Sequence, residues 1–431
     1  MKVSWLSAVL VGAAATNAID TISAVGNKFF TSSGTQFFVK GVAYQLTPAD
    51  PLVDATQCAL DVDLMKTLGT NAIRVYHVDP KANHDKCMST LADAGIYTLI
   101  DLDTFDTYIL PNDPWWNQTQ HDRYSEVMDA FIKYDNVLGF FVGNEIIARA
   151  NESQVAPYIK TAARDMKSYR DAKGYRQVPI GYSAADIAEL RPMLQDYLTC
   201  GGNSSEIIDF FALNSYEWCD PSTYATSGYA VLQEQAKNFP VPIFFSETGC
   251  NVGGPRVFDD QAAIFGPEMV NDWSGSIIYE WIEEANEYGI ISYGPKVDPT
   301  ATGSNIEGGF TRAGKPTAIS PDFDNLKSQW AKATPTGVAK ANFKPSVSTR
   351  ACPAATSGGW LVDGNVALPT LGETFSGTYT TVPSATVTES ATAASGTSSS
   401  TSSTNPAPPT KEIAGMGAGL VGVMLFFTFW L

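Results

Sequence analysis

Eight short apolar runs, rich in β-branched and aromatic residues, alternate along this chain with segments of helical period. The runs cover residues 37–46, 71–78, 96–102, 137–145, 179–186, 207–216, 242–249 and 274–283. Between them, segments such as ALDVDLMKTLGT and YSEVMDAFIKY place apolar residues at i, i+3, i+4 and i+7. Strands that are apolar throughout are buried on both faces, as in a parallel sheet. The pattern predicts an α/β fold, a (β/α)8 TIM barrel, with a doubly wound open sheet as the alternative.

The two ends of the chain do not follow this pattern. Residues 1–18 combine an early lysine, a short apolar run and small residues at a cleavage point, as in a secretory signal peptide. Residues 411–431 contain an uncharged apolar tail, preceded by a polar spacer and by small residues near Ser402 and Ser403. That order is typical of a GPI-attachment signal, and a retained membrane helix is the alternative.

The chain between the two ends is expected to divide into a folded part and a stalk. Residues 19–352 are expected to form the barrel and a C-terminal extension, and residues 353–410 a Ser/Thr/Pro-rich stalk. From about residue 375 to 410 almost no side chain can bury area to offset the entropy of ordering the chain. We therefore expect the stalk to be disordered and O-glycosylated.

Cysteines and sequons fit a secreted protein. The six cysteines predict three disulfides, although the sequence alone allows fifteen pairings: Cys58, Cys87, Cys200, Cys219, Cys250 and Cys352. No Cys/His spacing indicates a metal site, and we expect neither a metal nor another cofactor. N-glycosylation sequons occur at Asn117, Asn151 and Asn203.

The charge balance excludes one class of partner. A formal net charge of −17 and a pI near 4.6 argue against nucleic-acid binding, because a phosphate-binding surface needs clustered Lys and Arg. A neutral polymer makes no such demand on the surface.

Two of the predicted strands end in glutamate, GFFVGNE at Glu145 and IFFSE at Glu247. Active sites of (β/α)8 barrels lie at the carboxyl ends of the strands, so both side chains should face the barrel mouth. Glycoside cleavage needs one protonated and one ionised carboxyl group on either side of the bond. Asn144, next to Glu145, is placed to bind a sugar 2-hydroxyl, and Tyr216 to donate to the Glu247 carboxylate. A pair of rim residues in ion pairs is the alternative.

Aromatic residues gather in the same strand-end segments. Their faces suit the apolar C–H faces of sugars, although each is as readily explained by core packing: Tyr44, Tyr76, Tyr216, Trp218, Tyr279, Trp281 and Tyr288. No G-x-S-x-G motif or Gly-rich phosphate loop points to another chemistry.

Four motifs carry a family resemblance: GNE at 143–145, NSYEWC at 214–219, FFSETGCN at 244–251 and YEWIEEANEYG at 279–289. With them the chain resembles the fungal GPI-anchored β-1,3-glucanosyltransferases of glycoside hydrolase family 72. The resemblance implies a (β/α)8 fold, double displacement, and transfer of a β-1,3-glucan fragment from a donor chain to an acceptor chain. It also implies a place at the outer face of the plasma membrane and in the cell wall.

The resemblance assigns roles to individual residues. Glu145 is expected as the acid/base and Glu247 as the nucleophile. On the donor side we expect Tyr76, the loop from Asp103 to Asp106, Asn144 and Tyr279; on the acceptor side we expect Glu145, Asp186 and Arg191. The implied disulfides are Cys58–Cys87, Cys219–Cys250 and Cys200–Cys352, the last clasping a C-terminal segment to the barrel. One branch of the family carries a further cysteine-rich carbohydrate-binding module, and no cysteine follows Cys352 here.

Two other functions are compatible with the sequence. A β-1,3-glucanase would form the same glycosyl-enzyme and pass it to water. A non-enzymatic cell-wall mannoprotein would keep the barrel without needing both glutamates.

Overall fold

The computed structural model of the protein describes residues 19–45, 50–201, 203–303, 305–345 and 350–377. The expected signal peptide at 1–18, the anchor signal at 411–431 with Ser402 and Ser403, and most of the stalk lie outside these residues.

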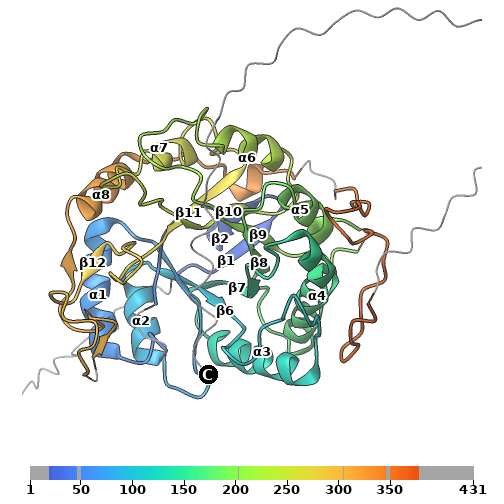
Figure 1. The fold of residues 1–431 in the computed structure, drawn as a ribbon, viewed down its shortest axis with the longest axis horizontal. Coiled ribbons are helices and arrows are strands. Elements are labelled where there is room, and N and C mark those ends of the chain that lie inside the picture. Colours follow the sequence, from blue (N-terminus) through green and yellow to red (C-terminus); the bar gives the residue numbers. More distant parts are fainter. Residues whose placement is uncertain (1–18, 46–49, 202, 304, 346–349, 378–431) are drawn as a thin grey trace, which may run out of the picture. The chain divides into compact units, whose positions relative to one another are not determined.

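Eight parallel strands close into a barrel at the centre of the molecule (Figure 1). They are β4 (Val39–Ala43), β5 (Ala72–Val75), β6 (Tyr97–Asp101), β7 (Val137–Asn144), β8 (Ile180–Ala185), β9 (Phe210–Asn214), β10 (Ile243–Thr248) and β11 (Trp273–Ile278). Each strand pairs with the next along the chain, and β11 returns to pair with β4. The predicted (β/α)8 barrel is confirmed and the open sheet is wrong, because β4 has a partner on both sides.

Helices surround the strands (Figure 1). They are α1 (Ala55–Leu68), α2 (Asp85–Asp93), α3 (Gln118–Phe131), α4 (Ala156–Ala172), α5 (Arg191–Thr199), α6 (Tyr229–Ala236), α7 (Asp260–Ile264) and α8 (Asp322–Lys332), with 3-10 turns η1 (Ala150–Val155) and η2 (Lys340–Asn342). Local chemistry sets several of their ends. The Asp54 side chain accepts from two backbone amides at the start of α1, and Gly69 ends that helix at φ 92°, which favours glycine.

A three-stranded antiparallel sheet covers the amino-terminal end of the barrel: β1 (Ile22–Val25), β2 (Lys28–Thr31) and β3 (Gln36–Phe37). Phe29 of β2 packs against Phe210 and Phe244, with ring centroids 6.1 and 5.9 Å apart. These rings belong to a core cluster that also contains Phe141 and the first residues of several strands. The sheet, which the strand pattern does not predict, thus seals the barrel floor and leaves its other end for a site.

Small strands lie in the segment after β11. They are β12 (Ile291–Ser292) with β15 (Thr317–Ala318), and β13 (Ile306–Glu307) with β14 (Phe310–Thr311).

Three disulfides are present, Cys58–Cys87, Cys219–Cys250 and Cys200–Cys352, and these are the pairs that the family resemblance implies. Residues 350–377, which include Cys352, form a C-terminal strap that packs against the outer helices α4 and α5. In the strap Trp360 and Val362 are fully buried, and the Leu361 amide donates to the Ser153 hydroxyl (2.9 Å). The expected start of the stalk at residue 353 is therefore wrong, because this segment buries large apolar side chains that a stalk would expose.

None of the helices within the described residues is both long and apolar enough to cross a membrane.

Candidate active site

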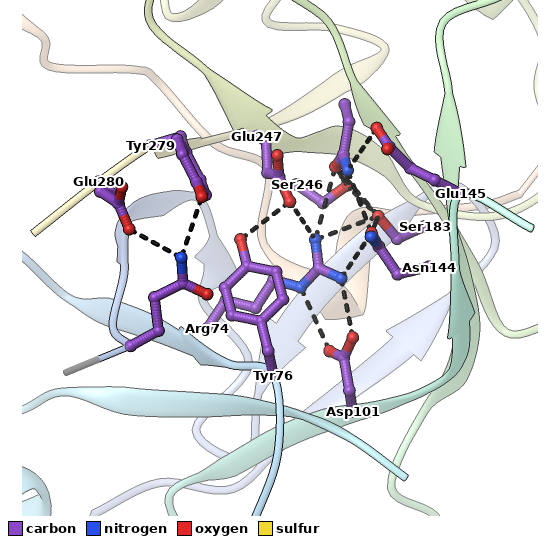
Figure 2. Close-up of polar contacts among 12 residues, drawn as sticks. Arg74, Tyr76, Asp101, Asn144, Glu145, Ser183, Ser246, Glu247, Tyr279 and Glu280 are labelled. Carbon is purple, nitrogen blue, oxygen red and sulfur yellow. Dashed lines mark hydrogen bonds and ion pairs between the residues drawn. The ribbon is translucent and has the colours of Figure 1, made fainter. Parts of the chain in front are cut away.

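The two glutamates lie at neighbouring positions on one end of the barrel (Figure 2). Glu145 directly follows β7, and Glu247 lies near the end of β10, where it pairs in register with Asn214 of β9. Glu247 is only 8% exposed. The continuous apolar strands before both residues hold their backbones, so both carboxyls are placed by the barrel itself.

The backbone of Glu145 has a φ of 49°, in the left-handed region that residues other than glycine rarely adopt. Left-handed backbone costs about 1 kcal/mol or more for such a residue and persists where neighbours enforce it. Here the Glu145 amide donates to the Ser183 carbonyl (2.9 Å), and the Ile146 amide donates to the Tyr182 hydroxyl (2.9 Å). Backbone strain at this position is typical of a functional residue held in a set orientation.

Glu247 receives donors on both carboxylate oxygens. Oε1 accepts from the Tyr76 hydroxyl (2.9 Å) and lies 3.3 Å from Nη1 of Arg74, and Oε2 accepts from the Tyr216 hydroxyl (2.9 Å). The Tyr216 contact is the one that sequence analysis anticipates. Burial raises the pKa of Glu247 to about 7, against the opposing effects of Arg74 and the two tyrosines, and the nearby Glu145 raises it further.

Glu145 is less constrained by hydrogen bonds. Its Oε1 accepts from Asn214 Nδ2 (3.0 Å). Burial raises the pKa of the Glu145 carboxyl, and the Asn214 hydrogen bond and the Arg74 charge oppose this rise.

The hydrogen-bond pattern decides which carboxyl of this pair carries a proton. A proton on Glu247 would displace a donor from Arg74, Tyr76 or Tyr216, because both of its oxygens already accept. Glu145 has an oxygen, Oε2, with no hydrogen bond from the described residues, so a proton there costs no contact. We therefore assign the shared proton to Glu145 and the negative charge to Glu247.

Arg74, from the middle of the apolar run AIRV, connects the strand ends, although sequence analysis does not include it among the site residues. It is fully buried, and its Nε and Nη2 donate to the two Asp101 oxygens at 3.2 and 2.9 Å. Nη2 also donates to Asn144 Oδ1 (2.8 Å), and Nη1 donates to Ser183 Oγ (3.1 Å). Its only sequence signal is a charged residue inside a strand that is otherwise apolar.

Asn214 is the second residue that sequence analysis leaves out. Its Nδ2 donates to Glu145 and to Asn144 Oδ1 (3.0 Å), and its Oδ1 accepts from Ser246 Oγ (2.7 Å). Asn144 Oδ1 is fully occupied by these donors, whereas its Nδ2 donates to no group within the described chain. That amide is therefore available to a sugar hydroxyl.

Tyr279, expected on the donor side, is held at the rim by residues that sequence analysis does not predict. Gln45 Nε2 donates to the Tyr279 hydroxyl (2.9 Å) and to Glu280 Oε2 (2.8 Å). Glu280 is fully buried, and burial raises the pKa of its carboxyl well above the usual range. Glu280 thus fixes Gln45, and Gln45 fixes the tyrosine.

The two expected aspartates of the loop after β6 lie in different surroundings. Burial, together with the neighbouring Asp101 carboxylate, raises the pKa of Asp103 to about 8. Asp106 instead lines a separate surface cleft with Tyr108, Trp115 and Asn117, and no strand-end residue lines that cleft. Asp103 therefore lies near Asp101 and Arg74 of the site, whereas Asp106 lies outside it.

On the expected acceptor side, Asp186 and Arg191 are paired with each other. Both side chains are buried, Ser215 Oγ donates to Asp186 Oδ2 (2.5 Å), and Arg191 Nε donates to Gln235 (2.8 Å). A buried arginine that is paired with Asp186 fits a role in holding that carboxylate better than a direct contact with a sugar.

Several of the strand-end aromatics turn out to be core residues. Tyr44 and Trp281 are fully buried and donate to the Asp61 carboxylate of α1 (2.7 and 3.3 Å), and Trp218 is buried against Tyr229. By contrast, Tyr216, Tyr279 and Tyr288 meet edge to face, with ring centroids 5.4 to 6.4 Å apart. This second group and Tyr76 lie beside the glutamates.

Across the residues that the structure covers, no three His, Cys, Asp or Glu side chains are grouped so that they could hold a metal ion.

A (β/α)8 barrel with a half-buried glutamate directly after its fourth strand and a buried glutamate near the end of its seventh defines the class of barrel enzymes that act on glycosidic bonds. The chain belongs to the glucanosyltransferase family, glycoside hydrolase family 72, whose family model matches residues 11–306.

Two relatives illustrate the similarity. Protein EPD1 of Candida maltosa is 40% identical over 359 residues, and 1,3-beta-glucanosyltransferase PGA5 of Candida albicans is 41% identical over 344 residues. The matches cover 81% and 74% of this chain, but only 62% and 51% of those proteins.

Among solved structures, Saccharomyces cerevisiae Gas2p in complex with laminaritriose and laminaritetraose has a TM-score of 0.74 and 38% identity. It covers 82% of this chain and 78% of its own.

Proposed function

We propose that this chain is a retaining β-1,3-glucanosyltransferase that cleaves a β-1,3-glucan donor and transfers the fragment to another β-1,3-glucan chain. In a fungal cell wall this reaction remodels and elongates glucan. The observation that carries the proposal is the pair of glutamates at the barrel mouth, Glu145 and Glu247, which differ in their hydrogen bonds. The laminari-oligosaccharides bound to the related Gas2p support β-1,3-glucan as the substrate.

In the first step, the Glu247 carboxylate attacks the anomeric carbon while Glu145 protonates the departing glycosidic oxygen. The O–H donors of Tyr76 and Tyr216 and the guanidinium of Arg74 keep Glu247 ionised and aimed. They also limit how far the carboxylate can rotate, so the attacking oxygen is positioned before substrate arrives.

In the second step, Glu145 acts as a base and takes the proton from the hydroxyl of an acceptor sugar, which attacks the glycosyl-enzyme. Two inversions at one carbon give net retention. A water molecule at the same place would give hydrolysis, so the outcome depends on how well the acceptor side binds sugar. We assign that side to Asp186, held by Arg191 and Ser215.

On the donor side we propose contacts from Tyr76, Asn144, Asp103 and Tyr279. Asn144 supports this best, because its Nδ2 makes no hydrogen bond within the described chain and lies next to the acid/base residue. Bound there, it would donate to the sugar 2-hydroxyl, a contact that strengthens in the transition state. Asp106, in its separate cleft, is not included in this assignment.

We also propose that the protein passes through the secretory pathway and is held by a GPI anchor at the outer face of the plasma membrane and in the cell wall. The composition of residues 1–18 and 411–431 and the disulfides support this. Phosphatidylinositol-specific phospholipase should release the protein from intact cells. Retention after the treatment would contradict the anchor.

The activity is tested by incubating the secreted protein with a reduced laminarin oligomer and separating the products by size. Products longer than the donor are expected, and they would establish transfer. Only shorter products would identify the chain as a β-1,3-glucanase instead. If the donor oligomer is unchanged, both the transferase and the glucanase functions are contradicted, and a non-enzymatic wall protein is favoured.

A further inference from the structure

The three sequons of this chain lie in unlike surroundings. Asn151 is exposed on η1, and Asn203 is exposed with its Nδ2 donating to Glu206 (3.2 Å). Asn117 instead forms part of the wall of the surface cleft in the loop between β6 and α3. At Asn117 the acceptor of a sequon thus lies in the wall of a preformed cleft.

This cleft has an accessible volume of 190 Å³ and a mixed polar and apolar wall. Its apolar side consists of side chains that are unusually exposed for their type, Tyr108 at 44%, Leu110 at 48% and Trp115 at 41%. Exposed apolar side chains that gather beside polar groups mark a binding surface more often than scattered ones do. Such a wall suits a ligand with one apolar and one polar face, as a sugar ring has.

The tryptophan of the wall is held in place by the C-terminal strap. Trp115 Nε1 donates to the Gly372 carbonyl (3.3 Å), and Trp115 pairs with Thr374 in an antiparallel bridge. Gln120 links the wall to the sequon, because its Nε2 donates to the Tyr108 carbonyl (3.2 Å) while its backbone amide donates to Asn117. The aromatic platform is thus rigid before any ligand binds.

Asn117 is the N-cap of α3, and of its side-chain amide the oxygen makes a hydrogen bond within the described chain. Oδ1 accepts from the Gln120 amide (3.0 Å), as part of a capping box. Nδ2 donates to no group within the described part of the chain. N-glycosylation consumes Nδ2 and leaves Oδ1 intact, so a glycan here is compatible with the helix cap.

We propose that Asn117 carries an N-linked glycan whose first N-acetylglucosamine unit lies in this cleft against Trp115 and Tyr108. The modification transfers an oligosaccharide from a lipid diphosphate donor. The sugar C1–Nδ2 bond forms, Nδ2 releases one proton, and the C1–O bond to the lipid diphosphate breaks with its electron pair on the leaving group. The proposal rests on the secretory route proposed above.

Glycopeptide mass spectrometry of the secreted full-length protein tests the attachment. A hexosamine-containing glycan on the Asn117 peptide is expected. Glycans on Asn151 or Asn203 with Asn117 unmodified would overturn this proposal alone. No glycan at any of the three would overturn the secretory route as well.

The position of the glycan in the cleft is tested with variants that preserve the helix cap. Asn117→Asp keeps a capping oxygen and removes the acceptor nitrogen, and Thr119→Ala removes the sequon at an exposed residue. Thr119→Ser keeps the sequon and serves as the matched control. We expect the first two to lower Tm by about 1–3 °C and to raise binding of an apolar dye, with transfer activity unchanged. If Asn117→Asp and Thr119→Ala both keep the wild-type Tm and dye signal, the glycan does not lie in the cleft.

A double-mutant cycle separates the glycan contact from the contact between Trp115 and the strap. Trp115→Ser alone loses both, whereas Trp115→Ser in the Asn117→Asp background loses only the strap contact. We expect a smaller Tm loss in the second case, and equal losses would overturn the glycan–tryptophan contact. Quenching of Trp115 fluorescence by laminaripentaose in unglycosylated protein, absent in Trp115→Ser, would make the cleft a glucan site instead.

Discussion

Arg74 Nη1 lies 3.3 Å from Glu247 Oε1, inside a barrel where the arginine has no exposure to solvent. The same guanidinium binds both oxygens of Asp101 and reaches Asn144, so one cation connects β5 with β6, β7 and β10. A charge in this position favours the ionised form of Glu247, the proposed nucleophile, and at the same time fixes Asn144 beside Glu145, the proposed acid/base. The site is one connected network and not two independent carboxyls.

Replacement of Arg74 should therefore affect both activity and stability. Arg74→Lys cannot reproduce the bidentate contact with Asp101, and we expect kcat/KM to fall by about 100-fold or more. Arg74→Met leaves Asp101 buried and unpaired, which should lower the free energy of unfolding by about 3–5 kcal/mol. Laminari-oligosaccharide kinetics and urea unfolding measure the two effects.

Arg123→Lys is the control for this change, because Arg123 forms an exposed ion pair with Glu126. It should leave both quantities near wild type. An Arg74→Lys protein with wild-type kcat/KM would show that the guanidinium network does not support catalysis.

Glu145→Gln and Glu247→Gln should each reduce transfer to less than about a hundredth of wild type, since the two roles cannot be shared. Both amides are close in shape to the carboxyls, so the fold should remain intact by circular dichroism. Higher residual activity in a folded variant would count against the assigned role.

The separation of the two carboxyls predicts the stereochemistry. In a crystal structure with bound oligosaccharide we expect the Glu145 and Glu247 carboxyl groups about 5–5.5 Å apart, because the nucleophile must touch the anomeric carbon. A separation above about 6.5 Å would leave room for water and indicate inversion. The anomeric configuration of the first-formed product, measured by NMR, tests retention against inversion independently.

Buried carboxyls with raised pKa values predict how stability changes with pH. The pKa is about 8 for Asp103 and about 7 for Asp260, in both cases chiefly because of burial. Between about pH 4 and 8 the folded state keeps protons that the unfolded state has released, so the free energy of unfolding should decrease as pH rises. Tm should fall from pH 5 to pH 8.

Asp260→Asn supplies a check on this pH dependence, because Asp260 is buried and lies outside the glutamate pair. The amide cannot ionise, so this variant should have a higher Tm than wild type at pH 8, and the difference should shrink toward pH 5. A difference that does not change with pH would contradict the raised pKa of Asp260.

The disulfide Cys200–Cys352 should contribute more stability than the other two. It joins residues 152 apart in the chain, against 29 for Cys58–Cys87, which corresponds to about 5 and about 3.5 kcal/mol of loop entropy. Paired Cys→Ala variants compared by urea unfolding measure this order. Equal losses for the two pairs would show that loop length does not control the effect, and non-reducing peptide mapping checks the pairing.

Much of the framework could be predicted from local patterns. Alternating strand and helix periods identify the eight barrel strands, and the position of each glutamate after an apolar run places it at the barrel mouth. These are properties of consecutive residues, so the chain carries them before it folds. The short β1–β3 sheet and the strap escaped prediction because their burial depends on contacts with distant segments. Trp360 stands among the Ser, Gly and Pro residues of the strap, and only its packing against Tyr197 makes it part of the core.

The sequence by itself determined the (β/α)8 fold and the two glutamates, and the family motifs supplied their expected roles. Only the tertiary structure decided which side chains control those glutamates. Arg74 and Glu247 are separated by 173 positions, and no local pattern relates them. Tyr44 and Tyr216 both follow apolar strands, yet Tyr44 donates to Asp61 in the core and Tyr216 donates to Glu247. The physical reason is that hydrogen bonding and burial depend on neighbours in space, which barrel closure brings together and the order of residues does not specify.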